Sequence, residues 1–327
     1  MPSKSNGVST NGCNLCQGVE FETVGLQDRR QKPLHTVVCK RCGLVSHGAI
    51  PSEAEIARYY ETEYRKDYHA ELTPSPQRVV REWRRGQELL RRMQPFLRPK
   101  DRVFEVGAGI GCNVKQFELA GFRASGIEPG EGFRKYSRDQ LGAQISSGFL
   151  EDQKGESQYD VVLLVHVLEH LRDPLASLTH LRKMLQPGGR LYVEVPNVAG
   201  PHAAPGKLFH YAHIYNFTHL TLRMLGEAAG LTVKHQFTSL SNKNVAILFT
   251  KGSPQKWYLN PESYAHTMSG LKRYSQLTYH LRPSYLVERI STLARHSSAR
   301  IAAKSRARAI VARCQVVNSV QATTKAA

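Results

Sequence analysis

A glycine-rich turn lies between two segments of different apolar periodicity, and its residue types suit the binding of an anion. The apolar run 103–106 leads into Gly107-Ala108-Gly109-Ile110-Gly111, and a polar–apolar segment over 113–120 follows. This spacing predicts a strand, a tight turn and the start of a helix. The glycines permit left-handed backbone angles and let a ligand approach the main chain closely. The unpaired N–H groups and positive dipole end of the helix favour a carboxylate or a phosphate.

Two acids stand where packing alone would favour apolar residues. Glu105 lies inside the first strand, and Glu128 ends the next strand-like run, 123–127. An acid at the tip of the second strand is placed to accept both hydroxyls of a ribose. Cys112 occupies the sixth position of the turn, so the pattern is Gly-x-Gly-x-Gly and not the fingerprint of a dinucleotide site.

Four of the six cysteines form two Cys-x-x-Cys pairs, Cys13 with Cys16 and Cys39 with Cys42. Each pair aims two thiolates at one point, and two such knuckles complete a tetrahedral zinc site. In a cytosolic protein this spacing indicates metal binding more often than disulfides. We therefore predict a structural Zn²⁺ whose four positions are all filled by protein. Unligated or redox-active cysteines are the alternative.

Short apolar strands alternate with helical stretches from residue 101 onward, which predicts a parallel sheet with crossover helices. The dense apolar run 161–165 is typical of a buried central strand. The expected strands are 103–106, 123–127, 143–146, 161–165 and 190–195, with a closing hairpin over 231–237 and 244–251. Ser52 and Glu55 form a capping box ahead of tyrosines at helical spacing. The expected helices after it are 77–97, 113–120, 131–140, 174–186 and 218–229, and a basic amphipathic helix is expected over 283–320.

Together these motifs resemble the class I S-adenosylmethionine (SAM)-dependent methyltransferases, which implies a Rossmann-like, seven-stranded α/β sheet with helices on both faces. The resemblance covers roughly residues 101–250 and includes Glu128-Pro129, His-Val-Leu-Glu-His-Leu after the 161–165 strand, and Leu-x-Pro-Gly-Gly. It implies that the glycine turn holds the methionine part of SAM and that Glu128 holds the ribose. It also implies an adenine edge near the main chain of Phe149 and Leu150, and His166 close to the cofactor.

The N-terminal cysteine pairs narrow the resemblance to the branch that modifies sugars, including deoxysugar C-methyltransferases and enzymes near polysaccharide synthesis. In that branch the counterpart of His170 is a catalytic histidine, and His213 ends a Tyr-His-Glu-His segment that here reads His210-Tyr211-Ala212-His213. An oxygen or carbon acceptor must lose a proton, and histidine is suited to take it. The first candidates are His170 and His213, and the second candidates are Tyr215 and His210.

The chain then divides into a zinc ribbon (1–50), a helical connector (51–100), a SAM-dependent methyltransferase domain (101–251) and a basic helical extension (252–327). The connector carries tyrosines at helical spacing. We expect them to pack the ribbon onto the main domain, and the alternative is that they line the entrance to a substrate site. The net charge is +18, and residues 251–327 hold 13 Lys and Arg against 2 Asp and Glu. Such a tail attracts nucleic acid, anionic lipid or an acidic partner, unless it is only a solvated helix face.

The predicted function is methyl transfer from SAM to a small-molecule or glycan acceptor, such as a sugar nucleotide. The alternatives are an RNA methyltransferase that uses the ribbon and the tail to bind RNA, and an inactive scaffold with the same fold. The polar N-terminus has no signal-peptide apolar region, and the longest apolar run is 161–168. These features predict a cytoplasmic protein, with peripheral attachment to a membrane through the tail as a hypothesis.

Overall fold

The computed structural model describes residues 12–62, 73–200, 203–239, 242–253 and 256–326. The chain forms two compact units. The first contains residues 1–64, 165–183 and 190–282, and the second contains residues 65–164, 184–189 and 283–327. We describe each unit by itself.

The first unit contains a four-stranded antiparallel sheet in the order β1-β2-β3-β9. Its first three strands are β1 (Phe21–Gln27), β2 (Pro33–Cys39) and β3 (Val45–His47). The fourth, β9 (Tyr215–Asn216), comes from a distant part of the sequence, because Val45 pairs with Asn216 and Ser46 with Tyr215. The sheet of the cysteine-bearing segment therefore gains its fourth strand from residues that follow it by more than 160 positions in the sequence.

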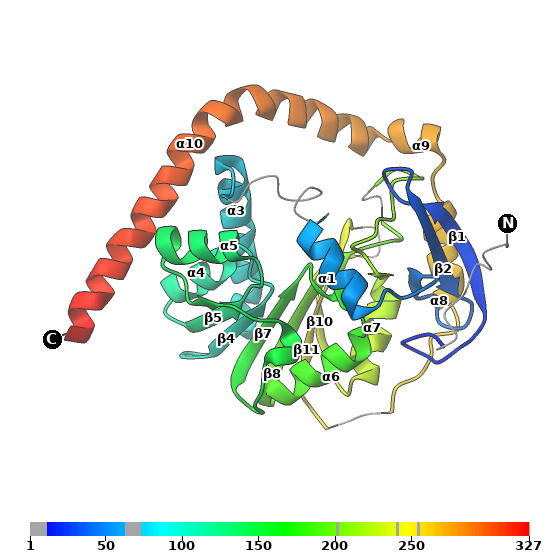
Figure 1. Ribbon diagram of the computed structural model, residues 1–327, viewed down its shortest axis with the longest axis horizontal. Helices are drawn as coiled ribbons and strands as arrows, with labels where there is room; N and C mark the ends of the chain where they lie inside the picture. The colour runs from blue at the N-terminus through cyan, green and yellow to red at the C-terminus, as the bar shows by residue number, and fades with distance from the viewer. Residues whose placement is uncertain (1–11, 63–72, 201–202, 240–241, 254–255, 327) are drawn as a thin grey trace. The chain divides into compact units, whose positions relative to one another are not determined.

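The main sheet has seven strands in the order β10-β11-β8-β7-β4-β5-β6, which confirms the predicted seven-stranded α/β architecture (Figure 1). Strand β4 pairs in parallel with β5 and β7, whereas β11 pairs antiparallel with β8 and β10. The strand order reverses at β4, and such a reversal point is where open α/β sheets bind ligands. The strands are β4 (Arg102–Val106), β5 (Arg123–Ile127), β6 (Ile145–Ser146), β7 (Tyr159–Val165), β8 (Leu185–Pro196), β10 (Thr232–Gln236) and β11 (Asn244–Thr250).

Helices begin and end close to the predicted positions where capping signals exist. Ser75 caps α3 (Pro76–Met93) by accepting from the Arg78 amide, and Thr218 caps α7 (His219–Ala228) by accepting from Thr221. Val79, Trp83, Leu89 and Met93 of α3 are buried along one face. The other helices are α1 (Glu53–Thr62), α4 (Cys112–Leu119), α5 (Glu131–Tyr136), α6 (Pro174–Met184), α8 (Ser263–Lys272), α9 (Gln276–His280) and α10 (Pro283–Ala326).

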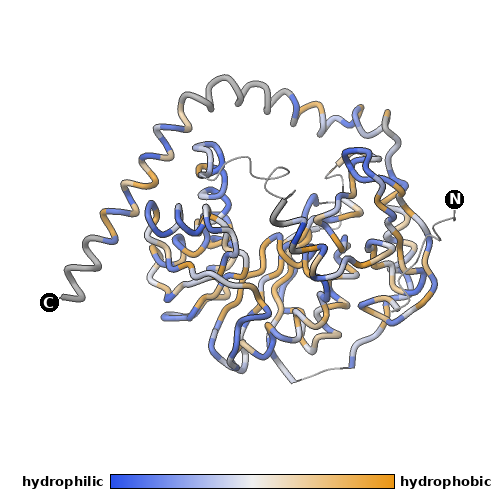
Figure 2. The backbone as a smooth tube through the Cα atoms, viewed as in Figure 1, coloured by the Kyte–Doolittle hydropathy of each residue, from blue (hydrophilic) through white to orange (hydrophobic). Residues whose placement is uncertain are grey.

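Strands β7 and β11 are buried along most of their length, as the apolar runs predict. Figure 2 shows these strands as hydrophobic segments, and it shows short hydrophilic and hydrophobic stretches alternating along α10. Within the second unit, α10 contacts α3, and the side chain of Asn318 on α10 lies 2.6 Å from the buried ammonium of Lys115. The predicted helix over 283–320 is therefore present, and it packs against α3 and bonds to Lys115 within the second unit. Among the described residues, no helix is both long and apolar enough to cross a membrane.

Candidate functional site

The glycine turn after β4 adopts the left-handed backbone that its composition predicts. Gly107, Gly109 and Gly111 have φ values of +68°, +55° and +76°. A Cβ atom built on Gly109 would meet nothing within 4 Å, so the main chain there is open to a ligand. Gly111 directly precedes α4, whose first N–H groups have no partner within the helix. The amides of Ala108, Gly109 and Gly111 are bonded within the protein, so the backbone donors that remain for a ligand are those at the start of α4.

Glu128, at the tip of β5, is held by the same turn. Its carboxylate accepts from the Gly109 amide at 2.9 Å and from the Gly130 amide at 2.8 Å. Burial raises the pKa of Glu128, and the two amides act in the opposite direction. Each oxygen keeps a lone pair for a further donor. The carboxylate is therefore rigidly placed and can accept two hydroxyls.

Glu105 is buried, and only one of its oxygens is paired. Asn113 on α4 donates to Glu105 Oε1 at 2.6 Å, whereas Oε2 has no hydrogen-bond partner among the described residues. Burial raises the pKa of Glu105 to about 8, with a contribution from the negative charge of Glu128. A buried, unpaired carboxyl oxygen two residues before the first glycine fits a cationic ligand group such as an ammonium.

Phe149 and Leu150 lie in the loop that follows β6, where a 3₁₀ turn begins. Phe149 is 58% exposed, and its amide donates to the Asp152 carboxylate at 3.1 Å. Leu150 is buried and begins a 3₁₀ turn, so no bond within that turn uses its N–H. An apolar ring edge and a backbone donor stand side by side here, as an adenine requires. Pro129 contributes to the nearby loop, where its carbonyl accepts from Arg134.

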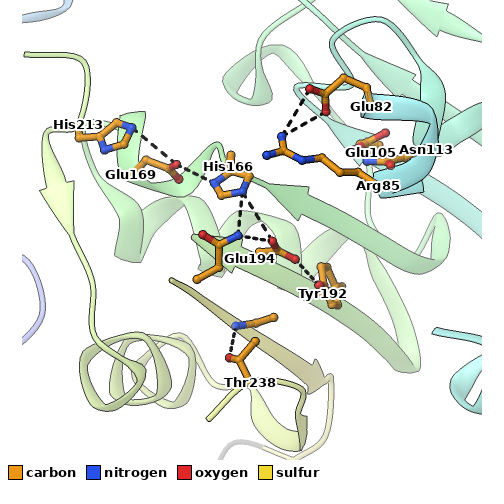
Figure 3. A network of polar contacts seen from close by, with 12 residues as sticks. Glu82, Arg85, Glu105, Asn113, His166, Glu169, Tyr192, Glu194, His213 and Thr238 are labelled. Carbon is orange, nitrogen blue, oxygen red and sulfur yellow. Dashed lines mark hydrogen bonds and ion pairs between the residues drawn. The ribbon is translucent and has the colours of Figure 1, made fainter. Parts of the chain in front are cut away.

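His166 follows β7 directly, within the first unit, and its backbone is left-handed with φ of +54°. Non-glycine residues rarely adopt this conformation, and it concentrates at functional sites. The His166 amide donates to the Glu194 carbonyl at 2.8 Å, which holds the bend. Figure 3 shows its imidazole between the carboxylates of Glu169 and Glu194, at 3.5 and 3.6 Å. Burial alone would lower the pKa of His166, but the two carboxylates outweigh it and raise the pKa to about 9.

His170 and His213 are brought together around the same buried carboxylate. Each Nε2 lies 3.9 Å from Glu169 Oε1, and the two rings meet edge to face at 4.9 Å. His170 Nδ1 lies 2.7 Å from the Ala212 carbonyl, so the ring is fixed against the segment that carries His213. Tyr215 differs from them, since it is 3% exposed and donates its hydroxyl to the Arg172 carbonyl at 3.2 Å. Burial also raises the pKa of Tyr215.

The four paired cysteines converge as their spacing predicts. Their Sγ atoms all lie within 4.8 Å of one another and are buried, with Cys13 and Cys42 at 3.4 Å and Cys16 and Cys39 at 3.5 Å. Zn–S bonds of about 2.3 Å in a tetrahedron place sulfurs about 3.8 Å apart. The donor type, number and separation therefore fit a structural Zn²⁺.

The cysteine knuckles are anchored to the rest of the first unit by polar contacts. Asn14, between the first two cysteines, donates to Asp173 at 2.9 Å and accepts from the Leu175 amide at 3.1 Å, which caps the start of α6. Ser263 on α8 donates to the Cys42 carbonyl at 2.8 Å. His47 on β3 donates its amide to the Ile214 carbonyl at 2.9 Å. The ribbon thus supports the segment that carries His213.

Sequence reasoning missed the acids around His166. Glu169 lies between two histidines in a stretch that is otherwise apolar, and this signal alone could have identified it. Glu194 and Asn244 come from β8 and β11, and Asn244 donates to Glu194 at 2.7 Å. No local pattern links these strands, because their pairing joins residues that are distant in the sequence. Of the predicted tyrosines of the connector, Tyr64 and Tyr68 lie outside the described residues.

Comparison with known proteins supports the assignment of the domain. The ubiquinone biosynthesis O-methyltransferase of Marinobacter nauticus is 30% identical over 105 residues, which are 29% of this chain and 44% of that protein. The tRNA U34 carboxymethyltransferase of Idiomarina loihiensis is 27% identical over 190 residues, 52% of this chain and 58% of that protein. The chain thus spans about half the length of these relatives.

A solved structure is also similar. The 1,6-didemethyltoxoflavin-N1-methyltransferase of Burkholderia thailandensis, with its substrate and S-adenosylhomocysteine bound, is 17% identical with a TM-score of 0.48. The match covers 72% of this chain and all of that chain. The sequence model of the family described as "Methyltransferase domain" matches residues 77–236. Residues 77–236 of this chain are thus similar in sequence to a methyltransferase domain.

Proposed function

We propose that this chain is a SAM-dependent methyltransferase that acts on an oxygen of a small polar acceptor, in the class of sugar nucleotides or glycans. The observation that carries the proposal is the Glu128 carboxylate, fixed by the Gly109 and Gly130 amides with lone pairs left for a ribose. The family match over residues 77–236 and the O-methyltransferase relative support the same reaction class.

The second unit holds the groups that fit SAM. The glycine turn faces the methionine part, the unpaired oxygen of Glu105 suits its ammonium, and Glu128 suits the ribose. The Leu150 amide and the Phe149 ring suit the adenine. When bound, SAM supplies an activated methyl group on a sulfonium. Placement of the acceptor in line with that methyl then accounts for much of the rate, because correct orientation alone can contribute several kcal/mol.

The first unit holds the groups that suit an acceptor. A small pocket with room for about one water molecule is lined by His170 and by residues that include Ile56, Tyr59, Tyr211 and Ile214, so an acceptor would have to widen it or bind at its mouth. The rings of Tyr59 and Tyr211 are 4.8 Å apart and tilted, which provides apolar faces for a cyclic acceptor. An acceptor hydroxyl must lose its proton, and we propose that His170 and His213 assist this step. Tyr215 is left out of the proposed bases because its hydroxyl is buried and bonded.

We further propose that Cys13, Cys16, Cys39 and Cys42 bind a structural Zn²⁺. Four ligands fill a tetrahedral site, so the ion would stabilise the ribbon and take no part in the reaction. We keep the domain arrangement predicted from the sequence as part of this proposal, with the ribbon over residues 1–50 ahead of the connector.

Methylation of RNA is the second candidate. The tRNA-modifying relative matches more of this chain than the O-methyltransferase does, and exposed basic residues lie along α10, among them Lys304, Arg306 and Arg308. Affinity for tRNA that falls steeply with salt, with a slope that reflects several phosphate contacts, would favour this candidate.

Attachment to a membrane is a proposal that rests on the same helix. On the same helix, the side chains of Leu286, Val287 and Val316 are 49%, 66% and 63% exposed. Basic helices with exposed apolar residues bind anionic interfaces. Retention by liposomes with anionic lipid at low salt, and release at high salt, tests the proposal.

Calorimetric titration with SAM, S-adenosylhomocysteine and NAD tests the proposed function. We expect both adenosyl ligands to bind with micromolar affinity, NAD not to bind, and Glu128→Ala to abolish binding. Radiolabelled methyl transfer to sugar nucleotides, lipid-linked glycans and tRNA then identifies the acceptor class. Absence of SAM binding by the natural protein would contradict the proposal and favour an inactive scaffold.

A further inference from the structure

Glu169 is a buried carboxylate whose charge is not balanced by hydrogen bonds. Its side chain is 1% exposed, and neither oxygen makes a hydrogen bond to any described residue. Burial of an ionised carboxylate without hydrogen bonds is strongly unfavourable. Three imidazoles lie at ion-pair distance from Oε1, namely those of His166, His170 and His213. An ionised Glu169 is therefore stable only if a cation, either an imidazolium or a metal ion, lies next to it.

His166 is shared between two carboxylates. Its Nδ1 faces Glu169 Oε1 at 3.5 Å and its Nε2 faces Glu194 at 3.6 Å. Figure 3 shows this row, with Tyr192 donating to Glu194 at 2.6 Å at its far end. The same oxygen of Glu169 also lies 3.9 Å from His170 and 3.9 Å from His213, so three imidazoles converge on one carboxylate oxygen.

The tautomer of His170 leaves a lone pair directed at this carboxylate. A carbonyl oxygen can only accept, so the 2.7 Å contact with the Ala212 carbonyl requires the proton of His170 on Nδ1. In the neutral ring Nε2 then carries a lone pair, 3.9 Å from Glu169 Oε1. A lone pair and a carboxylate oxygen repel each other unless a cation lies between them. Metal-bound histidines are held in the same way, with the other ring N–H donated to a carbonyl.

The geometry fits a metal ion with modest adjustment. One donor atom each from Glu169, His170 and His213 lies within 4.8 Å of the other two. Bonds of about 2.0–2.1 Å to a tetrahedral ion place such donors about 3.4 Å apart. Closing the two 3.9 Å separations requires shifts of about half an ångström, which side-chain rotation provides. The side chains of His170 and His213 are 15% and 16% exposed, so an exchangeable ligand can reach the ion.

We propose that Glu169, His170 and His213 bind a divalent transition-metal ion, separate from the four-cysteine site, with an open coordination position. Two histidines and one carboxylate with an open position form the ligand set of catalytic zinc sites. Metal binding itself does not depend on the reaction. Its role rests on the proposed function: the ion would bind the acceptor oxygen and lower the pKa of its hydroxyl, whose proton would pass to solvent water. His170 and His213 would then assist the proton loss as ligands of the ion and not as bases.

Metal content of the full chain tests the proposal directly. After incubation with Zn²⁺ and dialysis against metal-free buffer, we expect two zinc ions per chain by mass spectrometry. Glu169→Gln keeps the shape of the side chain and removes its charge, and we expect it and His213→Ala to retain one ion. His235→Ala, at an exposed position on β10, is the matched control and should retain two. One ion in the natural protein, or two in Glu169→Gln and His213→Ala, would overturn the proposal.

Titration with Co²⁺ separates the two sites. The cysteine site gives a thiolate-to-cobalt charge-transfer band in the near ultraviolet, whereas the second equivalent should add only weak visible absorption. That second absorption should be missing in Glu169→Gln, and a second thiolate band in its place would contradict the assignment. SAM titration of the same samples distinguishes the two hypotheses. Two ions without SAM binding would refute the proposed function alone, and SAM binding with one ion would refute the metal site alone.

Discussion

Replacement of Glu105 by Gln should uncouple SAM binding from proton release. In the free protein, burial raises the pKa of Glu105 to about 8, so the carboxyl is about nine-tenths protonated at pH 7. Ionised Glu105 is the form that pairs with the ammonium of SAM. We therefore expect binding at pH 7 to release about 0.9 proton per SAM, and the affinity to rise nearly tenfold from pH 6 to pH 7.

The same group should affect stability in the absence of ligand. The folded pKa of about 8 is above the ordinary value of 4.5, so stability is fully present below pH 4.5 and is lost as the pH rises towards 8. A difference of this size corresponds to at most about 5 kcal/mol. Glu105→Gln keeps an acceptor for Asn113 and cannot ionise. The variant should therefore be more stable than the natural protein at pH 8 and similar to it at pH 4.5.

Calorimetry of SAM binding at pH 7, in buffers with different ionisation enthalpies, measures the proton release. Urea unfolding at several pH values measures the stability of the same two proteins. The natural protein should show a buffer-dependent enthalpy that Glu105→Gln lacks. Equal proton release by both proteins would refute the reasoning, because another group would then be the source.

Three further predictions concern single contacts. Glu128→Gln should weaken SAM binding by about 2–3 kcal/mol in calorimetric titration, since charge-assisted hydrogen bonds contribute about 1.5–3 kcal/mol each, and an unchanged affinity would exclude Glu128 from the site. Asn318→Ala should lower the free energy of urea unfolding by about 1–3 kcal/mol because it removes a partner of buried Lys115, whereas exposed Gln315→Ala should have no effect. Removal of zinc by a strong chelator should lower the melting temperature and expose β3 to hydrogen exchange, and Cys16→Ser should reproduce both effects.

The sequence predicted the elements whose signals are local. Strand β5 has the predicted bounds, and the helices after Ser75 and Thr218 begin where capping residues stand. The convergence of the four cysteines also follows from local spacing, since each knuckle fixes its own two thiolates. Glu105 could be singled out because a charged residue inside an apolar strand is costly unless it has a use.

The unpredicted features arise from contacts between distant segments. The pairing of β3 with β9 joins residues 45–46 to 215–216, and neither strand is long enough to give a periodic signal. Glu169 stands between His166 and His170 in the sequence, but its burial and the approach of His213 arise only in the folded chain. The left-handed backbone of His166 has no signature in its residue type, since this conformation is usual only for glycine.

The pairing of β3 with β9 has a consequence for folding. The cysteine knuckles can bind a metal soon after residue 42 is synthesised, but their sheet gains its last strand only after residue 216. Residues 263 and 267 of α8 must also arrive before the carbonyls of Cys42 and Gly43 gain their hydrogen bonds. Closing such long loops costs conformational entropy and slows folding. The nascent ribbon therefore keeps one strand edge unpaired while the strands of the main sheet are synthesised.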